Sequence, residues 1–204
     1  MTAGIRIISD QGTIQIDETY RNLFVRVAGV GGTVPGQSSD LCAMIPTAIT
    51  GDNYRWGTPV ASTTKWWLFA VLTGTATARF GLQIRDAAGN RVFDTSQQPL
   101  RIVDVLTITN LTAGSKAYPA GRQYAVVLGG VGWKTLKEAV QNGNLWTNTT
   151  TKYRFGFRVS SNTVYWDWYI WSYEQFKGED QSQGNSLTTG NTPATFLVVD
   201  VTGY

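Results

Sequence analysis

The sequence predicts an all-β protein, an antiparallel β-sandwich built as one large sandwich or as two joined ones. Three observations predict this class: a strand–turn–strand unit that occurs twice, a long hairpin with alternating apolar and polar residues, and frequent turn signals with almost no helical periodicity. A chain of 204 residues can also bury a core of the size that such a fold needs.

The repeated unit begins at Gly4 and again at Gly81, and the two copies align without a gap. Each copy is expected to form a short strand, a tight turn with a glycine at positive φ, and a second strand that ends in a backbone-bonded aspartate, followed by an apolar strand. We infer an internal hairpin repeat, which is a structural element and implies no chemistry. The identical pairs are Gly4/Gly81, Ile7/Ile84, Gly12/Gly89, Asp17/Asp94 and Leu23/Leu100.

The rest of the chain divides into further strands and turn-rich connections. We expect loops over 29–40 and 51–62, a turn over 113–121, and a polar, glycine-rich mobile segment over 177–191. The single predicted helix, one or two amphipathic turns, covers 134–141 and stops before Gly143. The further strands are expected at 41–48, 63–72, 74–85, 100–111, 123–128 and 194–201.

A possible domain boundary lies between Ala70 and Gly81, just before the second repeat copy. It would separate an N-terminal β region, 1–75, from a β-sandwich domain, 76–204. A single continuous domain over 1–204 is the alternative.

The strongest local pattern is a hairpin of 152–160 with 164–173, closed by a two-residue turn at Ser161-Asn162. This register makes one face wholly apolar and gathers arginines and aromatic residues on the other. The predicted apolar pairs are Val159–Val164, Phe157–Trp166, Phe155–Trp168 and Tyr153–Ile170. The pairs of the second face are Arg158–Tyr165, Gly156–Asp167, Arg154–Tyr169 and Lys152–Trp171.

The second face of this hairpin is the main candidate binding surface. Exposed to water, it would have the composition of a protein interface or of a platform on which sugars stack; covered by another sheet, it would be ordinary core. The loop Tyr54-Arg55-Trp56 is a further candidate, because loops often carry binding residues. The candidate residues are Tyr54, Arg55, Trp56, Arg154, Arg158, Tyr165, Asp167, Tyr169, Trp171 and Tyr173.

Composition argues against most catalytic chemistry. Histidine is absent, which removes the usual general base and the usual zinc ligand. The one cysteine, Cys42, can form no disulfide within the chain and is expected to be a small core residue. No calcium-loop spacing of acidic residues and no convincing carboxylate pair for glycoside hydrolysis occur. The sequence therefore predicts no enzyme, no cofactor and no metal site.

The net charge of +3 is small and its basic residues are dispersed, which disfavours nucleic-acid binding. No signal peptide or membrane span is recognisable, so we expect a soluble protein made in a cytoplasm. The unusual feature is the aromatic content, with eight tryptophans and nine tyrosines.

Three segments, 4–22, 81–104 and 196–204, resemble a group of small, uncharacterised tail proteins of bacteriophages and prophages of Gram-negative bacteria. The most recognisable parts are Val-Phe-Asp-Thr at 92–95 and Leu-Arg-Ile-Val-Asp at 100–104. The resemblance implies a virion protein of the tail tip, baseplate or fibre that binds other tail proteins. It implies no catalytic residues.

The same resemblance implies a location in the virion and assembly in the host cytoplasm. Such parts are usually cyclic oligomers, so a homo-oligomer is expected, with a trimer favoured. The segment 178–190 is a further candidate contact. Attachment to a host-surface glycan or protein is possible in this role, and a free-standing carbohydrate-binding module is the alternative function.

Overall fold

In a computed structural model, residues 4–9, 12–17, 23–36, 39–50, 59–72, 81–178, 182–190 and 193–204 are described, the first two ranges by their backbone only. The predicted all-β class is confirmed: these residues form antiparallel strands and no helix. The strands are β1 (Gly4–Ser9), β2 (Gly12–Asp17), β3 (Leu23–Thr33), β4 (Leu41–Ile45), β5 (Pro59–Val71), β6 (Gln83–Arg85), β7 (Arg91–Asp94), β8 (Ile102–Ile108), β9 (Gly114–Ala117), β10 (Tyr124–Gly130), β11 (Trp133–Asn142), β12 (Leu145–Ser160), β13 (Thr163–Gly178), β14 (Ser186–Gly190) and β15 (Ala194–Asp200).

Both copies of the repeated unit form two-stranded hairpins, β1–β2 and β6–β7. The turn of the second copy has Gly89 at φ 83°, a conformation that favours glycine. Asp94 ends β7 and accepts a hydrogen bond from the backbone N–H of Ser96 (2.8 Å), as expected of a strand-end aspartate. The registers differ by two residues, because Ile5 faces Ile16 whereas Ile84 faces Phe93.

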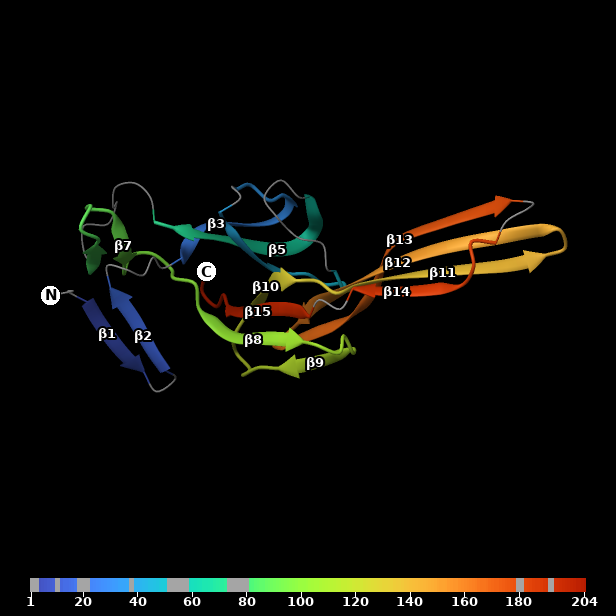
Figure 1. The fold of residues 1–204 in the computed structure, drawn as a ribbon. Helices are drawn as coiled ribbons and strands as arrows, with labels where there is room; N and C mark the ends of the chain where they lie inside the picture. Colours follow the sequence, from blue (N-terminus) through green and yellow to red (C-terminus); the bar gives the residue numbers. More distant parts are fainter. Residues whose placement is uncertain are drawn as a thin grey trace.

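A six-stranded sheet in the order β3-β5-β4-β10-β15-β8 forms the centre of the fold (Figure 1). It curls until its edges meet at one end, where Leu100 donates its backbone N–H to Leu23 (2.7 Å) and Val25 donates to Gln98 (2.9 Å). Trp67 and Phe69 are buried on the concave side. Trp66 is buried on the other side, so the adjacent tryptophans point to opposite faces, as predicted.

The second sheet, in the order β14-β11-β12-β13-β9, packs against half of the first and makes the sandwich. The faces meet in a cluster that includes Phe155, Phe157 and Phe196, with the rings of Phe157 and Phe196 5.5 Å apart. The segment that follows β4 also contacts this sheet. Thr50 and Phe157 exchange two backbone hydrogen bonds (3.0 and 2.8 Å). Burial of these rings is a main source of stability.

The strands β11–β14 continue far beyond the sandwich as a projecting arm (Figure 1). β12 and β13 each have 16 residues, which corresponds to about 50 Å at the usual rise of a strand. We call the face that carries Phe155 and Phe157 the inner face and the face that carries Arg154 and Arg158 the outer face.

The predicted pairing of β12 with β13 is confirmed from Ser160↔Thr163 to Tyr153↔Ile170. The predicted pair Lys152–Trp171 is wrong. A β-bulge at this point leaves Trp171 without a partner on β12, and Lys152 lies opposite Ser172 instead. The turn Ser161-Asn162 is as predicted, with Ser161 at φ 52°. The bulge reverses the expected face of every later residue of β13, and Tyr173 therefore lies on the inner face.

Four other local predictions are wrong. The expected helix over 134–141 is strand β11, which pairs with β12 on one side and β14 on the other; this pairing overrides the helix propensity of its Leu, Lys, Glu and Ala residues. The expected loop 29–40 begins as β3, which runs to Thr33 with Gly31 and Gly32 at positive φ. The expected mobile segment 177–191 contains β14, and the expected turn 113–121 contains β9.

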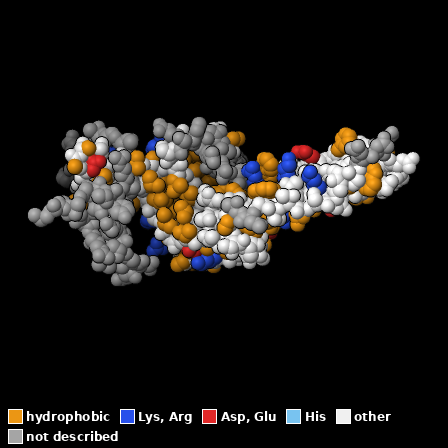
Figure 2. All heavy atoms as spheres, viewed as in Figure 1, with side chains coloured by type: hydrophobic (Ala, Val, Ile, Leu, Met, Phe, Trp, Pro, Cys, Tyr) orange, Lys and Arg blue, Asp and Glu red, His pale blue; other side chains and the backbone are white. Residues whose placement is uncertain are grey.

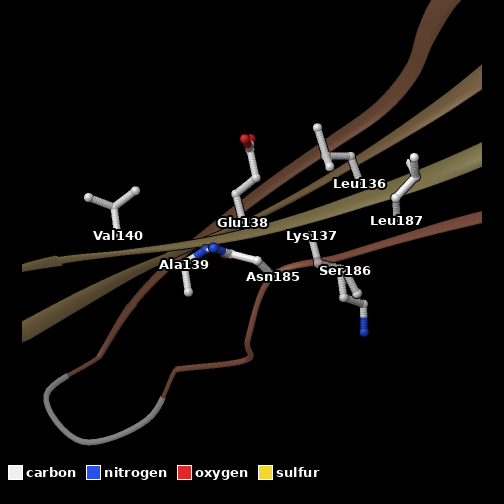
Figure 3. A pocket seen from close by; sticks show the side chains of 8 residues that line it. All are labelled: Leu136, Lys137, Glu138, Ala139, Val140, Asn185, Ser186 and Leu187. Carbon is white, nitrogen blue, oxygen red and sulfur yellow. The ribbon is translucent and has the colours of Figure 1, made fainter.

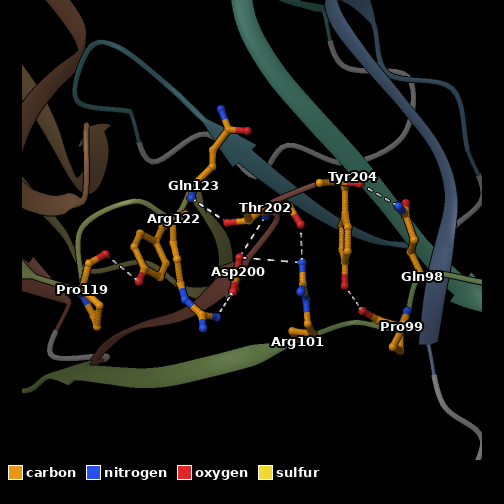
Figure 4. Close-up of polar contacts among 11 residues, drawn as sticks. Gln98, Pro99, Arg101, Pro119, Arg122, Gln123, Asp200, Thr202 and Tyr204 are labelled. Carbon is orange, nitrogen blue, oxygen red and sulfur yellow. Dashed lines mark hydrogen bonds and ion pairs between the residues drawn. The ribbon is translucent and has the colours of Figure 1, made fainter.

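A polar cluster fixes the C-terminal segment against the start of β8 (Figure 4). Arg101 donates to the carbonyl of Thr202 (2.6 Å), lies 3.7 Å from a carboxylate oxygen of Asp200, and stacks on the ring of Tyr204 (4.5 Å). Tyr204 also donates its hydroxyl to Pro99. Two segments of the tail-protein resemblance, 100–104 and 196–204, thus contact each other and act structurally.

Candidate functional site

The outer face of the hairpin carries six of the candidate residues on β12 and β13. Arg158 stacks on Tyr165 (3.9 Å to the ring centroid), and Arg154 stacks on Trp171 (4.0 Å). Tyr169 lies directly opposite Arg154. No residue of this group is buried, so the face is not sandwich core.

Asp167 is exposed on this face and accepts the backbone N–H of Trp168 (2.7 Å), and it forms no ion pair within the described part of the chain. The bulge places Glu174 on the same face, although simple alternation predicts opposite faces. The β12 partners of the two carboxylates, Gly156 and Thr150, are six positions apart, or about 20 Å along the strand. This separation is too large for paired catalytic carboxylates, which need about 5–10 Å.

Trp133, which was not among the predicted candidates, lies beside Arg154 on β11. Its ring covers Gly190 of β14, since a Cβ added at Gly190 would lie 2.3 Å from Trp133 Nε1. Trp133 and Trp171 are 45% and 49% exposed. Trp133 was missed because the sequence predicts a helix over 134–141 in place of strand β11.

Between these rings lies a hollow of about 240 Å³. The side chains of Lys134 and Tyr153 point to the inner face, where Lys134 Nζ lies 4.9 Å from the Tyr153 ring, so only their backbone can line the hollow. The lining residues are Val131, Trp133, Lys134, Thr135, Lys152, Tyr153, Arg154 and Trp171.

The inner face of the arm carries large exposed apolar side chains among polar ones. Ile170 and Tyr173 are each 58% exposed, and Val140 and Leu187 are exposed as well. In Figure 3, Leu136, Glu138, Val140 and Leu187 point to one side of the sheet, whereas Lys137, Ala139 and Ser186 point to the other. The inner face therefore presents large apolar side chains that the sandwich does not cover.

The tip of the arm has unpaired strand edges. β14 pairs with β11 only as far as Lys137, and the backbone N–H of Ala139 is instead donated to the side chain of Asn185 (2.7 Å). A hollow of about 390 Å³ lies at this edge (Figure 3). β9 pairs with β13 only up to Trp166, so the following residues of β13 also form an edge. Such edges are sites at which another strand can add.

The remaining candidates have structural roles or lie outside the description. Residues 51–58, with Tyr54, Arg55 and Trp56, lie outside the described residues. Cys42 is buried in the core, as predicted, and burial raises the pKa of its thiol to about 12, with a smaller contribution from Asp40. The carboxyl and phenol groups with shifted pKa values lie in hydrogen-bonded ion pairs or in the core.

Asp94, Asp104 and Asp200 illustrate this structural use of charge. Burial alone would raise the pKa of each carboxyl, but hydrogen bonds and cationic partners lower it below its ordinary value. The buried pair Arg91–Asp94 is 2.8 Å apart, and Lys116–Asp104 is 2.7 Å apart. In the described ranges, no three His, Cys, Asp or Glu residues form a group that could hold a metal ion.

Comparisons of the chain with protein-family models, with curated proteins and with solved structures find no match. Within the described residues, no helix has the length and apolar character needed to cross a membrane.

Proposed function

We propose that the chain is a structural protein of a bacteriophage tail, in the tip, baseplate or fibre region, that works by binding neighbouring proteins and contains no catalytic centre. The sequence resemblance supports the tail role, and the projecting arm supports the binding role. The observation that carries the proposal is the set of large apolar side chains exposed on the inner face of the arm, Ile170, Tyr173, Val140 and Leu187.

This face has the properties of a contact surface. Apolar surface is stabilised by leaving water, and exposed aromatic residues are enriched at the centres of interfaces. A sheet three or four strands wide that projects without cover gains much of its stability when a partner packs on it. The edge of β13 beyond Trp166 adds backbone donors and acceptors for the same partner.

The proposed partners are further copies of this chain and other tail proteins. A tail protein is part of a symmetric particle, and closed rings are the common solution for identical subunits. A trimer is the favoured assembly, and attachment to a host-surface receptor is a further part of the proposed role.

Light scattering on the full chain tests the assembly. We expect an oligomer that dissociates when Ile170 or Leu187 is changed to serine, since each change places a polar group in the contact. Val30→Ser is the matched control, because Val30 is 60% exposed but lies on the sandwich. A monomeric parent chain, together with absence of the chain from purified phage particles by mass spectrometry, would contradict the proposal.

A carbohydrate-binding module is the second candidate, and the pair of exposed indoles on the outer face favours it. This function requires a monomer whose tryptophan fluorescence changes with a glycan, and it requires no tail partner. The two candidates use opposite faces of the arm, so substitutions on each face separate them.

A further inference from the structure

The outer face of the arm contains two indoles that the fold does not use. The structure describes seven of the eight tryptophans; Trp66 and Trp67 are buried, and Trp166 and Trp168 donate their indole N–H groups to the carbonyls of Thr112 (3.1 Å) and Leu111 (3.0 Å). Trp133 and Trp171 are exposed, and neither donates its indole N–H to another described residue. The seventh, Trp146, is half-buried on the distal arm, so Trp133 and Trp171 are the most exposed of the described tryptophans.

The sheet holds both rings in fixed orientations. Gly190 has no side chain, which allows Trp133 to lie over strand β14. Trp171 is the extra residue of the bulge in β13, and the guanidinium of Arg154 lies 4.0 Å from its ring centroid. A rigid, exposed aromatic surface of this kind loses little side-chain entropy when a ligand stacks on it.

The polar groups beside the rings match a hydroxyl-rich ligand. Thr135, Lys152 and Arg154 supply hydrogen-bond donors around the hollow of about 240 Å³. This volume is below the range of about 300–1,000 Å³ that drug-sized ligands occupy, and it suits a single ring rather than an extended molecule.

Charge indicates an anionic ligand. The outer face of β11–β13 carries four cations, Lys137, Lys152, Arg154 and Arg158, against two carboxylates, Asp167 and Glu174. One of these carboxylates already faces a cation, since Glu174 lies 3.4 Å from Lys152 Nζ. Figure 2 shows Lys and Arg side chains gathered where the arm leaves the sandwich. Arginine next to a stacking ring is well suited to bind a carboxylate.

We propose that the hollow between Trp133 and Trp171 binds an acidic oligosaccharide. One sugar ring stacks on the exposed indole of Trp133, and its carboxylate faces Lys152 and Arg154. This inference goes beyond the proposed tail function and is independent of it, because assembly is assigned to the inner face and the sugar to the outer face.

Titration of the full chain with tetragalacturonate, followed by tryptophan fluorescence and calorimetry, tests the site. We expect saturable binding that weakens with added salt and that falls at least tenfold in Trp133→Ala and Trp171→Ala. Maltotetraose, a neutral oligosaccharide, should bind at least tenfold more weakly, and tetraglutamate, an acidic peptide, should not bind. Equal binding of maltotetraose would overturn the acidic class, and equal binding of tetraglutamate would overturn sugar stacking.

Three substitutions that retain both tryptophans make the test specific. Lys152→Gln should weaken tetragalacturonate binding several-fold, whereas Glu174→Gln should strengthen it, because it removes the carboxylate that competes for Lys152. Gly190→Ala should weaken binding by displacing the Trp133 ring. Val30→Ser, on the sandwich, is the control and should leave affinity unchanged. Absence of tetragalacturonate binding at millimolar concentration, with unchanged circular dichroism, would refute the site.

Discussion

The backbone N–H of Leu100 donates a hydrogen bond to the carbonyl of Leu23 (2.7 Å), and these two residues occupy the same position in the two copies of the repeat. Phe24 pairs with Pro99 in the same antiparallel bridge. A residue that pairs with its own repeat equivalent lies next to a local two-fold axis. The duplication is therefore a relation of symmetry between two halves of one sheet, as well as a similarity of sequence.

The same symmetry relates the other strands of the six-stranded sheet. The order β3-β5-β4 of the first half is matched by β8-β15-β10 of the second, and β4 and β10 meet in the middle. Val25 and Val27 face Phe69 and Leu68, just as Ile102 and Asp104 face Val199 and Val198. The bulge falls at Arg26 in one half and at Val103 in the other, which are repeat equivalents. We infer that the duplicated unit is a hairpin followed by three sheet strands.

The arm lies in the second half of the chain, at the position where the first half has a short connection between two strands. The first half joins β4 to β5 through 46–58, whereas the second half joins β10 to β15 through 131–193, which contains β11–β14. The base of this insertion covers one side of the second half, through Phe155 and Phe157. Its distal part covers nothing in the described chain, so only the base of the arm contributes to the sandwich core.

The first prediction removes only the distal arm. Replacing 137–150 by Asn-Gly and 174–185 by a short Gly-Ser linker keeps every residue of the buried cluster, so the sandwich should fold with a melting temperature within a few degrees of the parent. Oligomers should dissociate more readily in light scattering, because the deletion removes Val140 from the contact face and keeps Ile170, Tyr173 and Leu187. An unfolded product would show that the tip is needed for folding, and an oligomer of unchanged stability would exclude the distal arm from the contact.

A second prediction compares two phenylalanines of the second sheet. Phe157→Ala opens a cavity between the sheets and should lower the free energy of unfolding by about 3–5 kcal/mol. Phe176, on the distal arm, is 70% exposed, so Phe176→Ala should change it by less than about 0.5 kcal/mol. Urea unfolding of both variants measures the difference. Equal losses would show that the tip is buried in solution.

The sequence predicted the features that local pattern controls. Alternation alone placed eight pairs of the β12–β13 ladder correctly, because a shift by one residue would have mixed the apolar and polar faces. It failed at Trp171, since a bulge depends on how the sheet bends and leaves no signal in the alternation. It also failed at 134–141, where strand pairing on both sides outweighs helix propensity. Both failures affected the outer face, which explains why Trp133 was missed and Tyr173 was misplaced.

A third prediction concerns the C-terminal cluster of Figure 4. Arg101→Gln removes the stacking on Tyr204 and the hydrogen bond to Thr202, and should lower the free energy of unfolding by about 1–2 kcal/mol. Arg122→Gln is the control: it also contacts Asp200 (2.6 Å), but its side chain is more exposed, and a surface pair contributes about 1 kcal/mol or less. Urea unfolding compares the two. A larger loss in Arg122→Gln would contradict the role assigned to Arg101.

The last prediction is the dependence of stability on pH. The pKa values of Asp94, Asp104 and Asp200 are lowered in the folded state, so the folded state binds fewer protons than the unfolded state in acid. Their contribution is complete above the unfolded value of about 3.9 and is lost as pH falls through the lower folded values. Burial raises the pKa of Cys42 to about 12, so its contribution is lost as pH rises from about 8.5 towards 12. With no histidine in the chain, stability should be nearly constant between about pH 5 and 8.

Two substitutions separate the acid loss of stability from the alkaline loss when urea unfolding is measured across pH. Asp200→Asn should be less stable than the parent at pH 7 and approach it below about pH 3, because protonation removes the same charge from the parent. Cys42→Ala should reduce the alkaline loss and leave the acid loss unchanged. A parent protein whose stability changed steeply between pH 5 and 8 would show that a group other than these controls folding. If stability at alkaline pH fell equally in Cys42→Ala, the loss would be assigned to the buried Tyr124 and the partly buried Tyr118, since burial also raises the pKa of both.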